Sequence, residues 1–128
     1  NLAARFESGQ KIYGTGIMAN EAIHNAVQDM VESRQLDLIQ VMGKEEPVRA
    51  FEIIDRKGAL SVTKSEVLGL YKEGLGLYER FEFAAAQKLF EQALKVDPQD
   101  GPSTLYVDRC EDFALNPPED LIFRAESK

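Results

Sequence analysis

The spacing of apolar residues changes partway along the chain. Up to about residue 54 the apolar positions form short segments of two kinds, whereas beyond about residue 65 they recur only at helical spacing. In the first part, Asn20 suits the N-cap of a helix of about three turns, whose apolar residues follow at intervals of three and four. These residues are Ala22, Ile23, Ala26, Val27, Met30 and Val31. The single apolar stripe predicts a helix that packs on a sheet.

Three short apolar segments of the first part predict strands. One is Ile17-Met18-Ala19, which follows Gly14-Thr15-Gly16, and the other two are residues 36–41 and 48–54. The polar segment 43–47 suits a turn between antiparallel strands. In both longer segments the alternation of apolar and polar residues slips by one position, which predicts a bulge or an edge position. The first part is therefore predicted to be α+β.

The second part predicts three helices, two of them ended by proline. The first helix is marked by Val67, Leu68, Leu70, Tyr71, Leu75, Leu77 and Tyr78, the second by Phe83, Ala86, Leu89, Phe90, Ala93 and Leu94, and the third by Leu105, Tyr106, Cys110, Phe113 and Ala114. Asp97-Pro98 ends the second and Asn116-Pro117-Pro118 the third. We expect the tail, 119–128, either to pack through Leu121, Ile122 and Phe123 or to fray. The predicted domains are 1–55, a linker at 56–64, and a helical segment with its tail at 65–128.

The first two helices have the spacing of a tetratricopeptide unit. Gly74, Ala86, Phe90, Ala93 and Pro98 follow the small, small, large, small, proline pattern of that repeat of roughly 34 residues, here about residues 67–100. The small residues let two antiparallel helices approach, and the phenylalanine fills the space between them. Because a lone unit cannot bury its outer face, we expect the third helix, the first part or another chain to cover it.

Composition excludes several classes of protein. The chain has 128 residues, a hydrophobic fraction of 44% and a net charge of −7, which argues against a nucleic-acid partner. Its one cysteine cannot form an internal disulfide, and this suits a cytoplasmic protein. No apolar segment approaches the roughly 18 residues needed to cross a bilayer, and the first residues do not form a secretory signal. We expect a piece of a longer protein, whose membrane anchor, if it has one, lies upstream.

Few residues suggest chemistry when no family is considered. His24 is expected to be a surface or edge-packed residue, and Gly14-Thr15-Gly16 lacks the Lys-Ser/Thr that a phosphate loop requires. Asp37 and Asp55 have the chemistry of metal ligands, but each is more simply explained as a strand-end or turn residue. Cys110 lies at helical apolar spacing, which favours a buried structural thiol.

Asn1 and Arg5 are the exception. They are four residues apart and lie on one face if the segment is helical. An amide and a guanidinium displayed together suit a phosphate that carries developing charge. Terminal asparagines and surface arginines are common, so the residues alone leave a plain surface role open.

Several segments, in order, resemble the class III adenylate and guanylate cyclases. Residues 1–7, Asn-Leu-Ala-Ala-Arg-Phe-Glu, resemble the family's helix start, Asn-x-Ala-Ala/Ser-Arg-Leu/Met-Glu. Tyr13-Gly14-Thr15-Gly16-Ile17-Met18 is similar to a family strand, Asn20-Glu21-Ala22 to a helix start, and Arg34-Gln35-Leu36-Asp37 with residues 41–48 to a hairpin. The pattern of Tyr106 and Arg109-Cys110 also resembles the helical extension of some bacterial members. The resemblance implies an α+β fold: the C-terminal part of a ferredoxin-like cyclase domain over residues 1–55, followed by an all-α, tetratricopeptide-like extension.

This resemblance also implies an activity and a site. The parent enzyme would convert ATP, or GTP, to a 3′,5′-cyclic nucleotide and pyrophosphate as a homodimer with Mg²⁺ or Mn²⁺. Asn1 and Arg5 of one subunit would orient the triphosphate across the dimer interface and stabilise the transition state. The aspartates that bind the metals lie upstream in the family, so we expect no metal ligand in this chain and no activity from it alone.

One position departs from the family pattern. The lysine expected to hold the terminal phosphates aligns with Met42, and Lys44, two residues on, has the strand parity to replace it. A solvated turn lysine is an equally good interpretation of Lys44. The departure keeps an alternative open: a tetratricopeptide-like interaction module attached to a degenerate, non-catalytic cyclase domain. In either case the helical extension is expected to contact protein.

Overall fold

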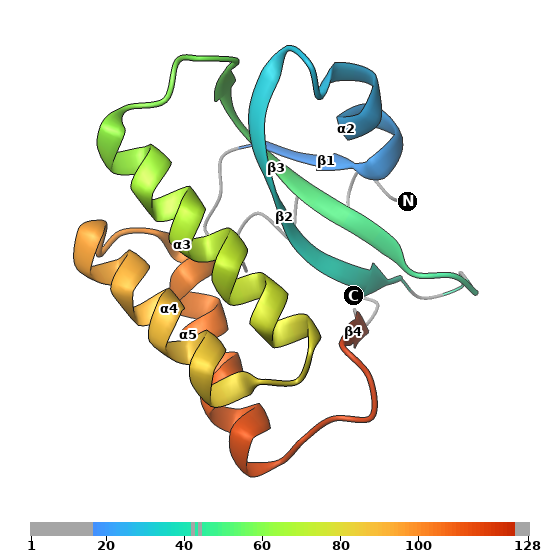
Figure 1. Ribbon diagram of the computed structural model, residues 1–128. Coiled ribbons are helices and arrows are strands. Elements are labelled where there is room, and N and C mark those ends of the chain that lie inside the picture. Colours follow the sequence, from blue (N-terminus) through green and yellow to red (C-terminus); the bar gives the residue numbers. More distant parts are fainter. Residues whose placement is uncertain (1–16, 42, 44, 125–128) are drawn as a thin grey trace. The chain divides into compact units, whose positions relative to one another are not determined.

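The computed structural model describes residues 17–41, 43 and 45–124 of the chain (Figure 1). They form two compact units. Unit 1 contains the chain up to Ala59 together with the segment from Asp120 onward, and unit 2 is Leu60–Glu119. In the sequence, unit 2 is therefore inserted between two parts of unit 1.

The described residues of unit 1 form a mixed sheet and one short helix, which confirms the predicted α+β class. The order of its strands among the described residues is β1-β3-β2-β4. The elements are β1 (Ile17–Asn20), α2 (Glu21–Val27), β2 (Val31–Gln40), β3 (Val48–Arg56) and β4 (Ile122–Arg124). The long strands β2 and β3 form the predicted antiparallel hairpin, β1 pairs antiparallel with β3, and β4 pairs parallel with β2.

The predicted slip in alternation is confirmed as a bulge in β2. Gln35 pairs with Phe51 and Asp37 pairs with Ala50, so that Leu36 is an extra residue on β2 with no partner of its own on β3. A bulge of this kind inserts one residue into one strand of an antiparallel pair and increases the local twist.

The bulge changes which residues of β2 face the core. Before it, Arg34 and Leu36 are buried at even positions, and after it Asp37, Ile39 and Val41 are buried at odd positions. Because side chains alternate strictly between the faces of a regular strand, a one-residue insertion reverses the assignment from that point on. Residues before the bulge and residues after it therefore both contribute to the core of unit 1.

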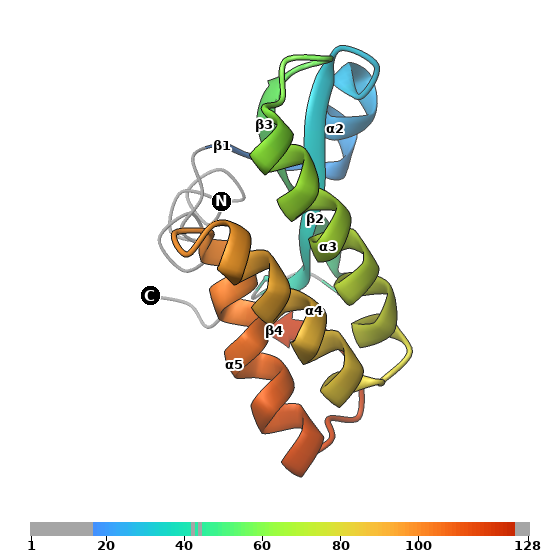
Figure 2. The ribbon, with the colours of Figure 1, turned by 60° about the vertical axis from the view of Figure 1, so that its left-hand side comes forward.

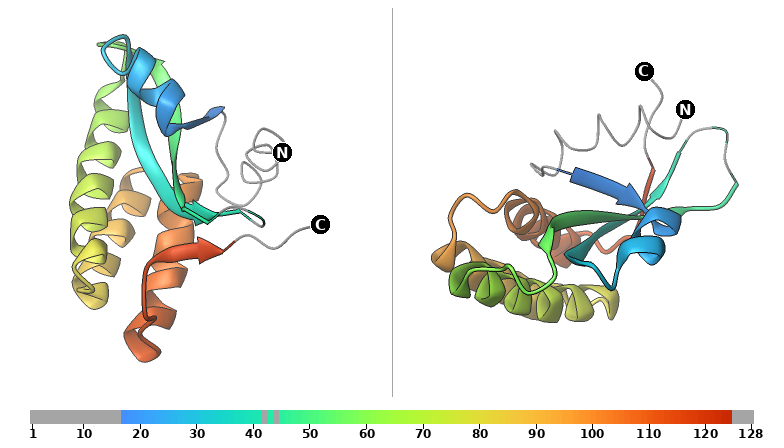
Figure 3. Two further views of the ribbon diagram at one scale, coloured as in Figure 1. Left: turned by 90° about the vertical axis from the view of Figure 1, so that its right-hand side faces the viewer. Right: turned by 90° about the horizontal axis from the view of Figure 1, so that it is seen from above.

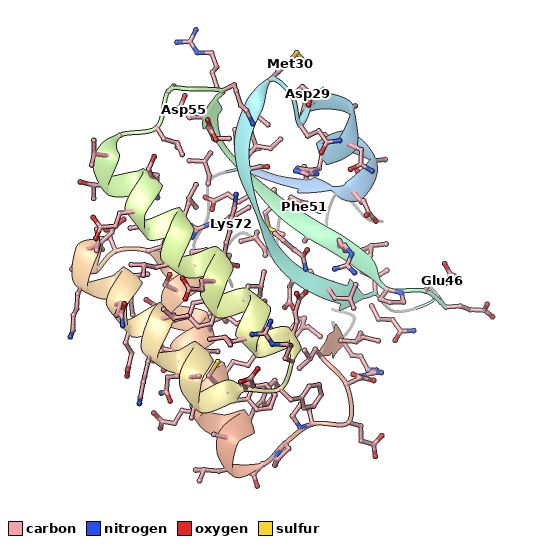
Figure 4. The ribbon with its side chains drawn as sticks, in the orientation of Figure 1. Asp29, Met30, Glu46, Phe51, Asp55 and Lys72 are labelled. Carbon is pink, nitrogen blue, oxygen red and sulfur yellow. The ribbon has the colours of Figure 1, made fainter. Side chains whose placement is uncertain are left out.

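The helix after Asn20 is shorter than predicted. Its N-cap is as expected, since the Asn20 Oδ1 accepts a hydrogen bond from the Ile23 N–H at 2.8 Å. The predicted third turn is wrong, because α2 ends at Val27, has no buried residue, and is followed by Met30 in an exposed turn (Figure 4). Val31 instead begins β2 and pairs with the end of β3, so strand pairing outweighs the helical spacing of the sequence.

Unit 2 contains the three predicted helices, and their ends follow from local chemistry. They are α3 (Val62–Glu79), α4 (Phe83–Val96) and α5 (Gly101–Leu115), and they lie side by side in Figure 2. The Ser61 hydroxyl caps α3, and the Asp100 carboxylate caps α5 by accepting from the Ser103 N–H. The prolines at 98 and 117 follow the ends of α4 and α5, as the sequence indicates.

Aromatic rings from all three helices fill the core of unit 2. Tyr106 of α5 is central, because its ring centroid lies 5.9 Å from that of Tyr71, 4.9 Å from that of Tyr78 and 5.0 Å from that of Phe90. Tyr106 and Phe90 are almost completely buried. The Arg109 guanidinium lies over the Tyr106 ring at 5.1 Å, which explains the Tyr106 and Arg109 pattern of the sequence as a packing arrangement.

The C-terminal segment groups with the sheet. The sequence predicts it as the tail of the helical part, whereas its described residues from Asp120 onward belong to unit 1, and Ile122–Arg124 form β4 (Figure 3). No helix within the described residues is both long enough and apolar enough to cross a membrane.

The Phe90 ring lies so close to Gly74 that one added methyl group is expected to change the stability of unit 2 strongly. A Cβ at this position would lie 3.1 Å from Phe90 Cε1 and Cζ, so we expect Gly74→Ala to destabilise unit 2 by about 1–3 kcal/mol. Gly69 of the same helix has open space around it, and there the same change should stabilise by up to about 1 kcal/mol. Urea unfolding of both variants measures the difference, and equal effects would contradict the packing described above.

Candidate functional site

The residues that the resemblance assigns to the phosphates lie outside the described residues. This applies to Asn1, Arg5 and Lys44, and also to Met42. The assignments therefore remain predictions from the sequence. What the structure shows is the hairpin on which the turn of Lys44 is built.

The turn between β2 and β3 is closed by local contacts. Gly43 has a φ of +85°, a left-handed conformation that glycine adopts without strain. The Gln40 Nε2 donates a hydrogen bond to the Glu45 carbonyl oxygen at 3.0 Å, which joins the end of β2 to the turn. Glu46 lies at the exposed tip, at the opposite end of β2 from Met30 (Figure 4).

A buried ion pair connects the two strands of the hairpin. Arg34 and Glu52 are directly paired in the ladder, and the Arg34 Nε donates to the Glu52 Oε1 at 2.7 Å. The Arg34 side chain is only 1% exposed and that of Glu52 is 12% exposed. A charge this far from water needs its partner, because an unpaired buried charge is strongly destabilising. The ion pair of Arg34 with Glu52 therefore stabilises the hairpin of β2 and β3.

Asp37 lies at the bulge inside β2, which corrects the expectation that it ends a strand. It is buried, and its Oδ1 accepts a hydrogen bond from the Leu38 N–H at 2.9 Å. The other candidate, Asp55, is exposed near the end of β3 and accepts from the Arg56 N–H. Within the part of the chain that the structure describes, neither belongs to a group of three or more His, Cys, Asp and Glu side chains that could hold a metal.

His24 is an edge-packed residue, as predicted. Its ring stacks on Phe51 with the centroids 3.9 Å apart and the planes 3° from parallel, and its Nε2 lies 2.9 Å from the Ser33 Oγ. A histidine beside a serine hydroxyl suggests a base and nucleophile, but such a base needs a third group that orients its other nitrogen. The His24 Nδ1 is buried and has no hydrogen-bond partner among the described residues, so the pair lacks that group there. No sequence signal indicates this contact, because Ser33 lies beyond a turn, on another element.

An apolar groove lies at one end of unit 2. It has a volume of about 550 Å³ and is lined mainly by the turn between α3 and α4 and by the end of α5. Its lining residues are Phe81, Glu82, Phe83, Ala84, Ala85, Phe113, Ala114 and Pro117. Phe81 is 43% exposed and has a φ of +61°, an uncommon conformation for a residue with a side chain. Phe81 and Phe83, two residues apart where the second predicted helix begins, are the available sequence signal for this groove.

Cys110 is buried in α5, as its spacing predicted. Burial raises the pKa of the thiol from 9.0 to about 12, and the neighbouring Arg109 guanidinium opposes the shift only in part. A thiol held in its protonated form is a poor nucleophile and a poor metal ligand. This favours a packing role for Cys110.

One curated protein provides a comparison that extends over most of the chain. The chain is 33% identical, over 115 residues and 86% of its length, to part of a protein of Dictyostelium discoideum named "Adenylate cyclase, terminal-differentiation specific". It spans 5% of the length of that protein. No family model matches the chain, and no solved structure matches it. The similarity supports a relationship to a cyclase. Because unit 2 is nearly half of the chain, a match of this extent includes helical residues as well as the sheet.

The buried ion pair predicts a large effect of removing Arg34. Arg34→Met would leave the Glu52 carboxylate without its partner and should cost roughly 3 kcal/mol of the free energy of unfolding. Arg80 is the matched control, since its ion pair with Glu82 is exposed and Arg80→Met should change stability by less than about 1 kcal/mol. Chemical denaturation of both variants measures this, and similar losses would show that burial of the Arg34 pair has no special importance.

Cys110 should not react with thiol reagents while unit 2 is folded. At pH 8 we expect modification of native Cys110 only through unfolding, whereas a cysteine at exposed Ser65, introduced as Ser65→Cys, should react at once. Because the folded-state pKa is raised, the contribution of the thiol to stability is complete below about pH 9 and is lost as the pH rises toward about 12. Reaction of Cys110 as fast as the control would contradict its burial.

Proposed function

We propose that the chain is part of a nucleotidyl cyclase that converts ATP, or GTP, to a 3′,5′-cyclic nucleotide and pyrophosphate for cyclic-nucleotide signalling. The observation that carries this proposal is the similarity to a protein named as an adenylate cyclase, which extends over most of the chain. The name favours ATP as the substrate. In this proposal residues 1–55 are the C-terminal part of a ferredoxin-like class III catalytic domain, and the parent acts in the cytoplasm, free or anchored through upstream segments.

Asn1 and Arg5 are the residues that we assign to the reaction. Attack of the ribose 3′-oxygen on the α-phosphorus increases negative charge on the phosphate oxygens. A guanidinium that forms charge-assisted hydrogen bonds there stabilises the transition state more than the ground state. The asparagine amide would orient the triphosphate beside it. The proposal places both residues at the active site of the partner subunit in a homodimer.

The described residues contain no ligand set for the divalent cation of the reaction, Mg²⁺ or Mn²⁺. The carboxylates that would hold it belong, in this proposal, to the upstream part of the catalytic domain. The chain alone is therefore expected to be inactive. Lys44 is assigned to the terminal phosphates in place of Met42, on a turn that the contact between Gln40 and Glu45 joins to the end of β2.

Unit 2 is proposed to be a tetratricopeptide-like extension that positions, dimerises or regulates the catalytic domain through protein contacts. Two observations support this. Gly74 and Phe90 meet as the repeat pattern requires, and α5 packs on α4 with Tyr106 against Phe90. The third helix thus covers a face that a lone unit would leave open.

Met42 favours a second candidate, in which unit 2 is an interaction module and the cyclase domain is degenerate. The parent sequence upstream of residue 1 discriminates the two. A pair of aspartates in the metal-binding position supports the enzyme, and their absence supports the module.

Activity of the full-length parent tests the proposal directly. We expect cyclic-nucleotide formation with Mg²⁺ or Mn²⁺, and a loss of at least about a hundredfold in kcat for Arg5→Ala. Arg80→Ala, which removes an exposed arginine of unit 2, is the matched control and should keep the activity of the parent. Residues 1–128 alone should form no product. If the full-length parent forms no cyclic nucleotide from ATP or from GTP with either metal, the catalytic proposal is refuted.

A further inference from the structure

The turn between α3 and α4 has a phenylalanine at a position where glycine is usual. The Phe81 N–H donates a hydrogen bond to the Tyr78 carbonyl oxygen at 2.9 Å. The next N–H, that of Glu82, donates to the Leu77 carbonyl oxygen at 3.0 Å. These are the two hydrogen bonds of a Schellman motif, which ends a helix with one residue in the left-handed conformation. Phe81 is that residue, with a φ of +61°, so it carries a strain that glycine would avoid.

The Phe81 ring is exposed at the edge of the apolar groove that it helps to line. Its centroid lies 5.2 Å from that of Phe83, and the Phe83 ring contacts the ring of Phe113 edge-on at 5.5 Å. Phe83 is buried, whereas Phe81 is not covered within unit 2. The groove therefore has a lining of packed aromatic rings that is present before anything binds. An exposed ring that is kept despite backbone strain indicates a use at the surface.

The chain segments that form the groove are acidic. Residues 79–85 and 111–119 contain five exposed carboxylates and one arginine, a net charge of −4. The carboxylates are those of Glu79, Glu82, Glu111, Asp112 and Glu119. The arginine, Arg80, forms an ion pair with Glu82, so the other carboxylates give this end of unit 2 its charge. Such a surface attracts a cationic partner and repels an anionic one.

The ends of the helices add to this negative charge. α3 and α5 both end beside the groove, and the C-terminal end of a helix carries a partial negative charge. Both helices lie wholly within the described residues, and neither has a basic residue in its last turn. The N-terminus of α4 has the opposite partial charge, but its N-cap residue, Glu82, is itself acidic. The groove thus combines an apolar lining with surroundings that favour cations.

We propose that the groove of unit 2 binds a basic amphipathic segment of a partner protein. A large apolar side chain of that segment enters the groove beside Phe81 and Phe113. Lysines or arginines on either side of it lie against the carboxylates and the ends of α3 and α5. The same negative charges disfavour a nucleic acid or an anionic membrane surface. The inference rests on the role in protein contacts proposed for unit 2, and it adds the chemistry of the partner.

Two fluorescent peptides test the proposal with the complete chain. One carries a Leu-Phe pair between two clusters of lysine, and in the other glutamates replace the lysines. In fluorescence anisotropy we expect the lysine peptide to bind at least about tenfold more tightly, and to lose most of this advantage at high salt, because salt screens exposed charges. No binding of the lysine peptide, or equal binding of both peptides, would overturn the proposal.

Substitutions at the groove separate binding from folding. Because glycine suits the backbone at Phe81, we expect Phe81→Gly to unfold at or near the temperature of the unchanged chain and to bind the lysine peptide at least about tenfold more weakly. Val62→Ala shortens an exposed apolar side chain at the other end of α3 and should leave binding unchanged. Glu82→Gln should weaken binding severalfold, whereas Glu91→Gln, the same loss of charge farther along α4, should have no effect. Equal effects within either pair would contradict the proposed site.

Sedimentation of the complete chain over a range of concentrations tests a second copy as the occupant of the groove. We expect Phe81→Gly to leave the oligomeric state unchanged. A dimer that this variant abolishes would show that the groove is an interface between copies and would overturn the proposal. None of these measurements depends on nucleotide turnover, so failure of peptide binding is distinguishable from failure of the proposed cyclase activity.

Discussion

Pairing of β2 on both of its sides is the interaction on which the arrangement of the chain depends. On one side β2 forms a long antiparallel ladder with β3, and on the other it takes up β4. The chain enters the helical unit directly after one neighbour of β2 and leaves it directly before the other. One strand therefore brings together residues that are separated by about sixty others in the sequence.

The two units use different means to form a core. In unit 1 a bulge at Leu36 brings residues from both even and odd positions of β2 to the buried side, and a buried ion pair joins two strands. Unit 2 uses close packing, with a glycine of α3 against a phenylalanine of α4 and the ring of Tyr106 from α5 stacked on that phenylalanine. The similarity to the Dictyostelium protein covers most of the chain, and so it includes residues of both units.

Local signals in the sequence predicted most of the fold. Caps such as Asn20, the prolines after α4 and α5, and the polar turn at 43–47 act over a few residues, and each was placed correctly. The predictions were wrong where the secondary structure depends on pairing between strands that are far apart in the sequence. Helical spacing continued through Met30 and Val31, but pairing with the end of β3 made Val31 a strand residue. The strand β4 was equally hard to foresee, because three residues carry little pattern and their partner lies far away in the sequence.

The candidate site was harder to predict than the fold. The sequence predicts a strand end at Asp37 because the apolar segment begins only at Leu36, whereas β2 begins at Val31. The contact between His24 and Ser33 joins two elements that the sequence does not connect. Cys110 was predicted correctly, since burial follows from helical spacing alone. Asn1, Arg5 and Lys44 remain predictions, which rest on motifs and on chemistry.

The insertion of unit 2 between β3 and β4 also sets an order of assembly during synthesis. The ribosome delivers β1, α2, β2 and β3 first, and their antiparallel hairpin needs no later residue to form. The three helices emerge next and can pack as soon as α5 has left the exit tunnel. Only then does β4 become available, so the sheet that starts first is completed last, and the outer edge of β2 stays uncovered until the helical unit has been made.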